Sequence, residues 1–391
     1  MNQENENQST SVIETVNKYF NFKVQIICAA AVLVIISVGV FLYMFLNTWT
    51  KIRTLDTYAD AEACVGYQYA SYENGIIRYG RDGAVFQNIK GKENWNAPYQ
   101  MKNPKLVEAG ESFAIADYGG NDIVVFNKKG RRGEIHTTLP VERMAVSSQG
   151  IVAAILKNEE SPKVVIYDVN GNVLVEHSAS FDGTGYPSGL SLSPDGTIMA
   201  VSYVLIKEGK LNAALKFFYF GETGKNAEPE IFTTEYEGIL LPELFFMDDK
   251  IIVAAGDTGL YFYKIADDKK SAQETSYIGI AKEILGIFHD KTYIALTVKD
   301  RTNAQREVYF YKKDASLKVT MPITVEFVHS RYVSSQLILW NEKQCQIITP
   351  MKTEKFNGEF ELPLQEVIPI SGINKYLVID SSGMKTVRLT N

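Results

Sequence analysis

Short apolar or alternating runs recur along the chain, and a polar turn precedes most of them. The clearest copy is LSLSPDGTIMAVS at 190–202, where two strand-like runs flank the turn Ser193-Pro194-Asp195-Gly196. Proline at the second turn position and glycine at the fourth favour a type I turn, and aspartate can hydrogen-bond its own backbone. The run that follows the turn has eight copies: GIIRY (75–79), FAIAD (113–117), IVAAIL (151–156), TIMAVS (197–202), KIIVAA (250–255), TYIAL (292–296), LILWN (337–341) and KYLVID (375–380).

Each copy is followed by another short strand that usually ends in an aromatic residue and a turn, as in KVVIYDVNG (163–171) and GLYFYKIADD (259–268). Two further candidate strands lie before the next polar turn. Four strands per unit, at a mean spacing of about 43 residues, are typical of a β-propeller. The sequence therefore predicts an all-β fold over residues 55–391, an eight-bladed β-propeller or, alternatively, a seven-bladed one.

The two ends of this region predict how the ring closes. The last unit stops after its third strand, MKTVRLT (384–390), whereas two extra strands, around 55–59 and 65–71, precede the first copy. We expect the N-terminal strand to complete the last blade, because an open sheet edge invites aggregation.

The turn Ser193–Gly196 and its flanking strands resemble the repeats of bacterial propellers that carry an SPDG turn, the TolB-type and related WD-like families. The Gly-His and Trp-Asp dipeptides of true WD repeats are absent, and Trp340 precedes Asn341 instead. An N-terminal apolar segment followed by a divergent propeller also resembles an uncharacterised family of bacterial single-pass membrane proteins. That resemblance implies a membrane anchor and a propeller, and it implies no activity.

Residues 24–46 read VQIICAAAVLVIISVGVFLYMFL and contain no charge. A helix of this length, at ~1.5 Å per residue, spans the ~30 Å core of a bilayer. The sequence therefore predicts a polar tail at 1–23, a transmembrane helix at 24–46 and a juxtamembrane linker at 47–54. A cleaved signal peptide is the alternative, but its apolar core is shorter, ~7–15 residues, and a small-residue cleavage site should follow it.

The sequence indicates less strongly on which side of the membrane the propeller lies. Lys18 and Lys23 precede the segment and Lys51 and Arg53 follow it, so the flanking positive charges tie. A short tail inside and a large domain outside is the commoner arrangement. We therefore expect a single-pass protein of the cell membrane with a cytoplasmic N-terminus and an extracellular propeller.

Composition excludes several classes of protein. The net charge of −6, with lysine and arginine scattered, offers no basic stripe for nucleic acid. Three cysteines, Cys28, Cys64 and Cys345, exclude a disulfide framework.

No catalytic, cofactor or metal motif is found. The elbow motif G-x-S-x-G is absent, and the four histidines lie at no metal-binding spacing. Residues 221–225 resemble a turn of quinone-cofactor propellers, but without the tryptophan of those repeats. Residues 117–122 offer oxygens suited to calcium, but without the spacing of an EF-hand loop. We expect no cofactor and no enzymatic activity.

Loop length indicates a candidate binding face. Connections between second and third strands and between outer and inner strands emerge on one face of a propeller, and the longest predicted insertions fall there: 157–163, 181–189, 207–212 and 299–306. Loops on a rigid scaffold often carry binding residues. The candidate ligand-contacting residues are Tyr186, Lys207, Lys210, Lys299 and Arg301. Solvated insertions with no role are the alternative.

These patterns favour a membrane-anchored, non-enzymatic binding or scaffold module at the cell surface. Its expected partners are the lipid bilayer, through residues 24–46, and a protein or an envelope polymer. One alternative is a propeller-fold enzyme acting on envelope glycans, which two or more carboxylates or histidines gathered in the central channel would favour. Another is a membrane-associated assembly or sensor subunit.

Overall fold

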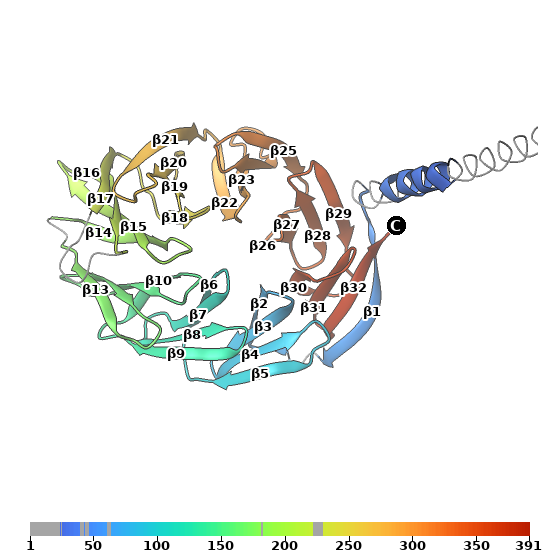
Figure 1. Ribbon diagram of the computed structural model, residues 1–391, viewed down its shortest axis with the longest axis horizontal. Helices are drawn as coiled ribbons and strands as arrows, with labels where there is room; N and C mark the ends of the chain where they lie inside the picture. The colour runs from blue at the N-terminus through green and yellow to red at the C-terminus, as the bar shows by residue number, and fades with distance from the viewer. Residues whose placement is uncertain are drawn as a thin grey trace, which may run out of the picture.

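The structure is a computed structural model that describes residue 24, residues 26–39, residue 43 and residues 47–60, 64–180, 183–221 and 230–391. Eight four-stranded antiparallel sheets surround a central opening (Figure 1). The prediction of an all-β, eight-bladed propeller is confirmed, and the seven-bladed alternative is excluded. Each of the eight copies of the recurring run forms the second strand of one blade.

The blades are numbered along the chain, with the innermost strand given first. Blade 1 comprises β2 (Gln68–Tyr72), β3 (Gly75–Gly80), β4 (Gly83–Asn88) and β5 (Glu93–Pro98); blade 2, β6 (Pro104–Ala109), β7 (Ser112–Asp117), β8 (Asp122–Asn127) and β9 (Gly130–His136); blade 3, β10 (Val141–Val146), β11 (Val152–Leu156), β12 (Lys163–Tyr167) and β13 (Val173–Ser178); blade 4, β14 (Tyr186–Leu192), β15 (Ile198–Lys207), β16 (Lys210–Tyr219) and β17 (Glu230–Glu237). Blade 5 comprises β18 (Glu243–Phe246), β19 (Ile251–Ala255), β20 (Gly259–Ile265) and β21 (Ala272–Gly279); blade 6, β22 (Glu283–His289), β23 (Tyr293–Lys299), β24 (Arg306–Lys312) and β25 (Leu317–Ile323); blade 7, β26 (His329–Val333), β27 (Gln336–Trp340), β28 (Gln344–Thr349) and β29 (Thr353–Glu359); blade 8, β30 (Leu364–Pro369), β31 (Lys375–Asp380), β32 (Gly383–Thr390) and, outermost, β1 (Lys51–Asp60).

Second strands are mostly apolar because neighbouring blades cover both of their faces. All five residues of β11 are buried, and Val152 and Ala154 pack with Ala114 and Val125 of blade 2 in one cluster. Outer strands have only one covered face, so β13 alternates exposed and half-buried residues. Burial on both faces explains why second strands read as apolar runs in the sequence.

The polar turns before the second strands are held by their own side chains. Ser193 Oγ accepts hydrogen bonds from the backbone N–H groups of Thr197 (3.1 Å) and Ile198 (2.9 Å). Asp248 plays the same part in blade 5 and Asp290 in blade 6, where each carboxylate accepts two backbone N–H groups. These positions carry serine and aspartate because short polar side chains can accept hydrogen bonds from the backbone N–H groups of the turn.

The ring closes as the sequence predicts. Strand β1 pairs antiparallel with β32, from Lys51 opposite Thr390 to Asp60 opposite Gly383. This strand begins at Lys51, four residues before the predicted start of the propeller at residue 55. Within the predicted linker, Trp49 also bridges to Phe356 of β29 through two backbone hydrogen bonds of 3.0 and 3.1 Å. The linker is therefore part of the propeller from residue 49 onward.

The N-terminal segment is helical over residues 26–39. Among the described residues, no helix combines the length and the apolar character needed to span a membrane. The predicted tail at 1–23 lies outside the described residues, and so do residues 25, 40–42 and 44–46 of the predicted transmembrane helix.

Two faces of the ring follow from this topology. Turns that join first to second strands and third to fourth strands emerge on one face. Residues 47–50 reach the propeller on the same face, because Lys51 pairs with Thr390 at the end of a third strand. We call it the proximal face. The opposite, distal face carries the second-to-third and outer-to-inner connections.

Candidate functional site

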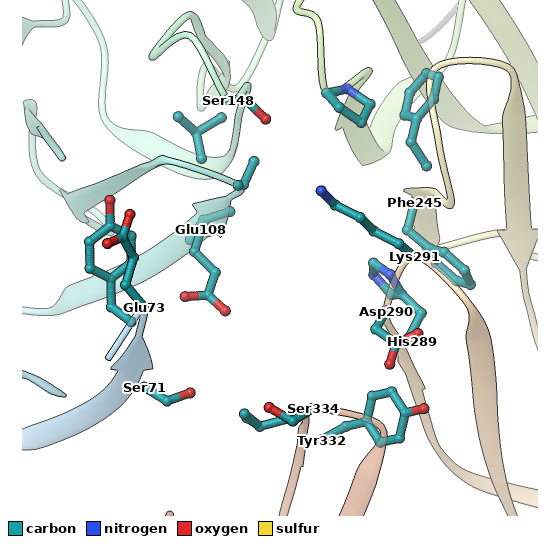
Figure 2. A pocket seen from close by; sticks show the side chains of 18 of the residues that line it. Ser71, Glu73, Glu108, Ser148, Phe245, His289, Asp290, Lys291, Tyr332 and Ser334 are labelled. Carbon is teal, nitrogen blue, oxygen red and sulfur yellow. The ribbon is translucent and has the colours of Figure 1, made fainter. Parts of the chain in front are cut away.

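A cavity of about 830 Å³ opens at the proximal end of the central channel. Its walls come from the first-to-second-strand turn of every blade and from the ends of the inner strands (Figure 2). Apolar side chains, among them Met144, Leu190 and Leu244, line part of the wall. Polar and charged side chains form much of the rest of the wall. Concave surfaces where polar groups converge among apolar side chains are common ligand sites.

Two carboxylates lie on one side of the cavity. Glu73, in the turn after β2, and Glu108, near the end of β6, appear on the same side of the opening in Figure 2, and Glu108 projects into the open space. Neither side chain has a hydrogen-bond or ion-pair partner among the described residues. Desolvation by the surrounding channel wall raises the pKa of Glu108, and the charge of Arg331 only partly offsets it. Although Glu108 is open to water in the channel, its ionised form is destabilised by the surrounding wall.

The opposite side of the cavity is formed by the end of β22 and its turn. The His289 ring stacks on Phe245, with ring centroids 4.0 Å apart and planes 7° apart. Desolvation lowers the pKa of His289 to about 4, against the opposing charge of Asp290, so the imidazole is neutral at pH 7. Lys291 extends from this side toward the cavity (Figure 2) and has no hydrogen-bond or ion-pair partner among the described residues. The cavity is therefore acidic on one side, and aromatic with one ammonium on the other.

An ion pair joins three inner strands in the channel. The Arg331 guanidinium on β26 donates to Glu366 on β30 at 2.6 Å and to the carbonyl oxygen of Tyr69 on β2 at 2.8 Å. Both charged side chains are mostly buried, 16% and 22% exposed. Desolvation raises the pKa of Glu366, while Arg331 acts in the opposite direction. This pair fixes the spacing of blades 7, 8 and 1 around the channel.

The described residues offer no metal site. Within the described ranges, no group of three or more histidine, cysteine, aspartate or glutamate side chains could hold a metal ion. In the Gly-rich turn at 117–122, Asp117 accepts hydrogen bonds from the backbone N–H groups of Lys102 (3.0 Å) and Asn103 (2.7 Å). Its carboxylate holds a loop in the manner of a turn residue. Most of the other Gly-rich stretch, 222–225, lies outside the described residues.

The five candidates from the sequence lie on the distal face, at the end of the ring away from the cavity. Tyr186 donates to Glu142, Lys207 is paired with Glu235 at 2.5 Å, and Lys210 is paired with Glu237. Lys299 ends β23, and Arg301 lies in the turn that follows. The candidates are spread over blades 4 and 6. Only Lys207 and Lys210 are brought together, as cross-strand neighbours.

One predicted insertion is not a loop. Residues 207–212 belong mostly to β15 and β16, which extend to Lys207 and from Lys210 and leave a turn of two residues. Glu208 and Gly209 both have positive φ, 53° and 75°, as a two-residue hairpin turn of type I′ requires. The Glu208-Gly209 dipeptide between two alternating runs is a sequence signal for a hairpin turn, and counting residues 207–212 as a loop missed it.

The residues missed by the sequence analysis are Glu73, Glu108 and Lys291. Glu73 and Lys291 belong to polar turns that the sequence analysis could explain as turn formers, and Glu108 lies on a first strand without a motif. The channel does gather carboxylates and a histidine, which is the feature expected to favour an enzyme. No distance between them defines a catalytic geometry.

Comparison with known proteins gives a family and a set of similar folds. The crystal structure of BamB from Moraxella catarrhalis is 12% identical, with a TM-score of 0.47, and the match covers 87% of this chain and 98% of BamB. The Pan2 WD40 domain from Neurospora crassa is 13% identical, with a TM-score of 0.39, over 59% of this chain and 70% of the domain. No curated protein matches the sequence.

The family match covers almost the whole propeller and begins just before it. Its description assigns no function and mentions no membrane segment, so the resemblance to single-pass membrane proteins stays a prediction. Residues 46–389 match the "Family of unknown function (DUF5711)", and the chain belongs to that family.

Proposed function

We propose that the chain is a membrane-tethered, non-enzymatic binding module whose propeller lies outside the cell and receives a basic segment of a partner protein in the proximal cavity. The observation that carries the binding role is the cavity itself, with the unpaired carboxylates Glu73 and Glu108 on one side. Support for the tether comes from the sequence, where residues 24–46 contain no charge.

The chemistry of the cavity favours a cationic group. An ammonium or guanidinium placed between the carboxylates and the Phe245 and His289 rings would make charge-assisted hydrogen bonds and face an aromatic wall. Binding would also relieve the desolvation cost of ionised Glu108. A neutral His289 does not repel a cation at pH 7. The Lys291 ammonium could donate hydrogen bonds to the backbone carbonyl oxygens or to a carboxylate of the same segment.

The test is a titration of the detergent-solubilised full chain with two labelled peptides of equal length, one rich in arginine and one rich in glutamate. We expect fluorescence anisotropy to report binding of the arginine peptide only. Glu108→Gln should weaken it about tenfold, the value of one charge-assisted hydrogen bond. Glu111→Gln is the matched control, because Glu111 lies on the same face outside the cavity lining. Equal binding of both peptides, or no loss in Glu108→Gln, would refute the proposal.

Sidedness has its own test. A C-terminal epitope tag is followed while protease is added to intact cells and to lysed cells. Loss of the tag from intact cells supports an extracellular propeller. Protection until lysis contradicts the extracellular location, and it would make an intracellular scaffold at the membrane the better hypothesis.

The presence of two carboxylates, Glu73 and Glu108, in the cavity lining also favours a second candidate, an enzyme that cleaves envelope glycans. Glycosidases use two carboxyl groups, one of them with a raised pKa that acts as the acid. Release of reducing ends from purified cell-wall glycan, abolished in Glu108→Gln, would support this candidate. No release by a preparation that binds the arginine peptide would exclude it.

A further inference from the structure

The proximal face is divided into two halves of opposite charge. Blades 7, 8, 1 and 2 form a continuous arc around the point where residues 47–50 join the ring. The described turns of these blades on the proximal face carry five lysines and two glutamates, Glu73 and Glu111. We call the lysines the basic arc: Lys90, Lys92, Lys128, Lys129 and Lys352. All five are exposed, and none forms an ion pair with another described residue.

The other half of the face has the reverse balance. The described turns of blades 3 to 6 carry eight aspartates and five lysines. Several of these charges are neutralised within the protein, as in the pairs Lys269–Asp195, Lys313–Asp248 and Lys250–Asp267. The excess of unpaired positive charge is therefore confined to the half of the face where the chain arrives.

Apolar side chains accompany the basic arc. Met351, in the turn before β29, is 49% exposed, and Ile373, in the turn before β31, is 60% exposed. Met351 lies on blade 7 and Ile373 on blade 8, and Trp49 is fixed to β29 of blade 7 by backbone hydrogen bonds. Figure 1 shows the N-terminal helix leaving the ring beside β29 and β32. The basic arc, the two apolar side chains and the point of attachment thus all lie on blades 7, 8, 1 and 2.

We propose that the basic arc rests on the anionic headgroups of a lipid bilayer, with Met351 and Ile373 entering the interfacial layer. This inference rests on the proposed tether, because residues 24–46 would hold the arc within a few residues of the membrane. Lysines attract an anionic surface only within about one Debye length, ~8 Å at physiological salt, so this attraction adds to the tether only where the proximal face lies against the bilayer. The contact orients the propeller, with the cavity mouth toward the membrane on the side of blades 7, 8, 1 and 2.

The test uses the full chain reconstituted into vesicles, with Cys28→Ser as background, because Cys64 and Cys345 are buried. A fluorophore is attached at Met351→Cys in the arc or, as the matched control, at Asn303→Cys on the distal face. Quenching by lipids that carry a headgroup spin label is compared between phosphatidylglycerol and phosphatidylcholine. We expect about threefold stronger quenching at position 351 in phosphatidylglycerol, lost at high salt, and none at position 303.

The combined charge reversal Lys128→Glu, Lys129→Glu and Lys352→Glu should bring quenching in phosphatidylglycerol down to the level in phosphatidylcholine. Circular dichroism confirms that this variant is folded. Equal quenching in both lipids, or quenching that survives the charge reversal, overturns the basic arc. Retention of the protein on vesicles through an alkaline carbonate wash is scored on the same samples. Loss in that wash refutes the tether, whereas retention without lipid-dependent quenching refutes only the arc.

Discussion

The two faces of the propeller use charge in opposite ways. On the distal face several charged side chains at the strand ends are neutralised in pairs, such as Lys207–Glu235, Lys282–Glu307 and Arg306–Glu326. At the proximal cavity, Glu108 and Lys291 remain without partners among the described residues, although the channel wall desolvates Glu108. Charge left unpaired at a cost is better evidence for a ligand than charge on a long loop, because folding alone gives no reason to keep it there.

A contrast also exists within the proximal face. Asp195, which does not line the cavity, is stabilised as a carboxylate, whereas Glu108, in the cavity wall, is destabilised as one. Partial burial opposes ionisation of Asp195, but hydrogen bonds from Lys269, Ser193 and Thr197 outweigh it and lower the pKa to about 2. The four predictions below test this division between structural and binding charge, from the largest expected change in unfolding free energy to the smallest.

Asp195→Ala should show the largest effect, a loss of about 2–3 kcal/mol in the free energy of unfolding at pH 7. The folded pKa lies below the ordinary value of ~3.9, so this stabilisation is complete above pH 4 and disappears as pH falls toward 2. Urea titrations at pH 7, 4 and 3 should show the gap between wild type and variant closing with acid. A gap that is constant with pH would mean that packing, and not the Lys269 pair, stabilises the turn.

His289→Gln tests the other wall of the cavity. The folded pKa of about 4 lies below the ordinary value of ~6.5, so the unfolded chain takes up a proton first and wild-type stability falls as pH drops from 6.5 toward 4. Because water screens the exposed ring, His289 should account for less than about 1 kcal/mol of the stability that the wild type loses over this pH range. We expect His289→Gln to lose that much less. The slope of unfolding free energy against pH, measured for wild type and variant between pH 6.5 and 4, tests this expectation. An unchanged slope would show that His289 protonates freely in the folded state.

Glu108→Gln should raise stability, in contrast to Asp195→Ala. A folded pKa above the ordinary value means that the ionised carboxylate destabilises the fold at neutral pH and no longer does so in acid, once both states are protonated. Water in the channel limits the gain to about 0.5 kcal/mol. A denaturant midpoint that rises at pH 7 but not at pH 4, together with lost peptide binding, would identify a residue kept for function. A lower midpoint at pH 7 would show that Glu108 has a structural partner.

The fold was largely predictable because it is repetitive. Eight buried second strands share one pattern, and a missing fourth strand at one end matched an extra strand at the other. The cavity was not predictable in this way. Glu73 and Lys291 look like any other turn residue, and only the ring brings turns that are more than 200 residues apart to one mouth. The distal candidates were chosen by loop length, which cannot show that Lys207 and Lys210 already have glutamate partners on β17.

Lys207→Ala and Lys210→Ala should show the smallest effect. Both ion pairs are exposed, with 49–65% of each side chain accessible, so each is worth within about 0.5 kcal/mol. The hairpin should persist, since its register depends on the Glu208-Gly209 turn and on the pairing of β15 with β16. Thermal unfolding and titration with the arginine and glutamate peptides measure both consequences. If either substitution changes peptide binding while Glu108→Gln does not, the distal face, which the sequence analysis favoured, is the binding face.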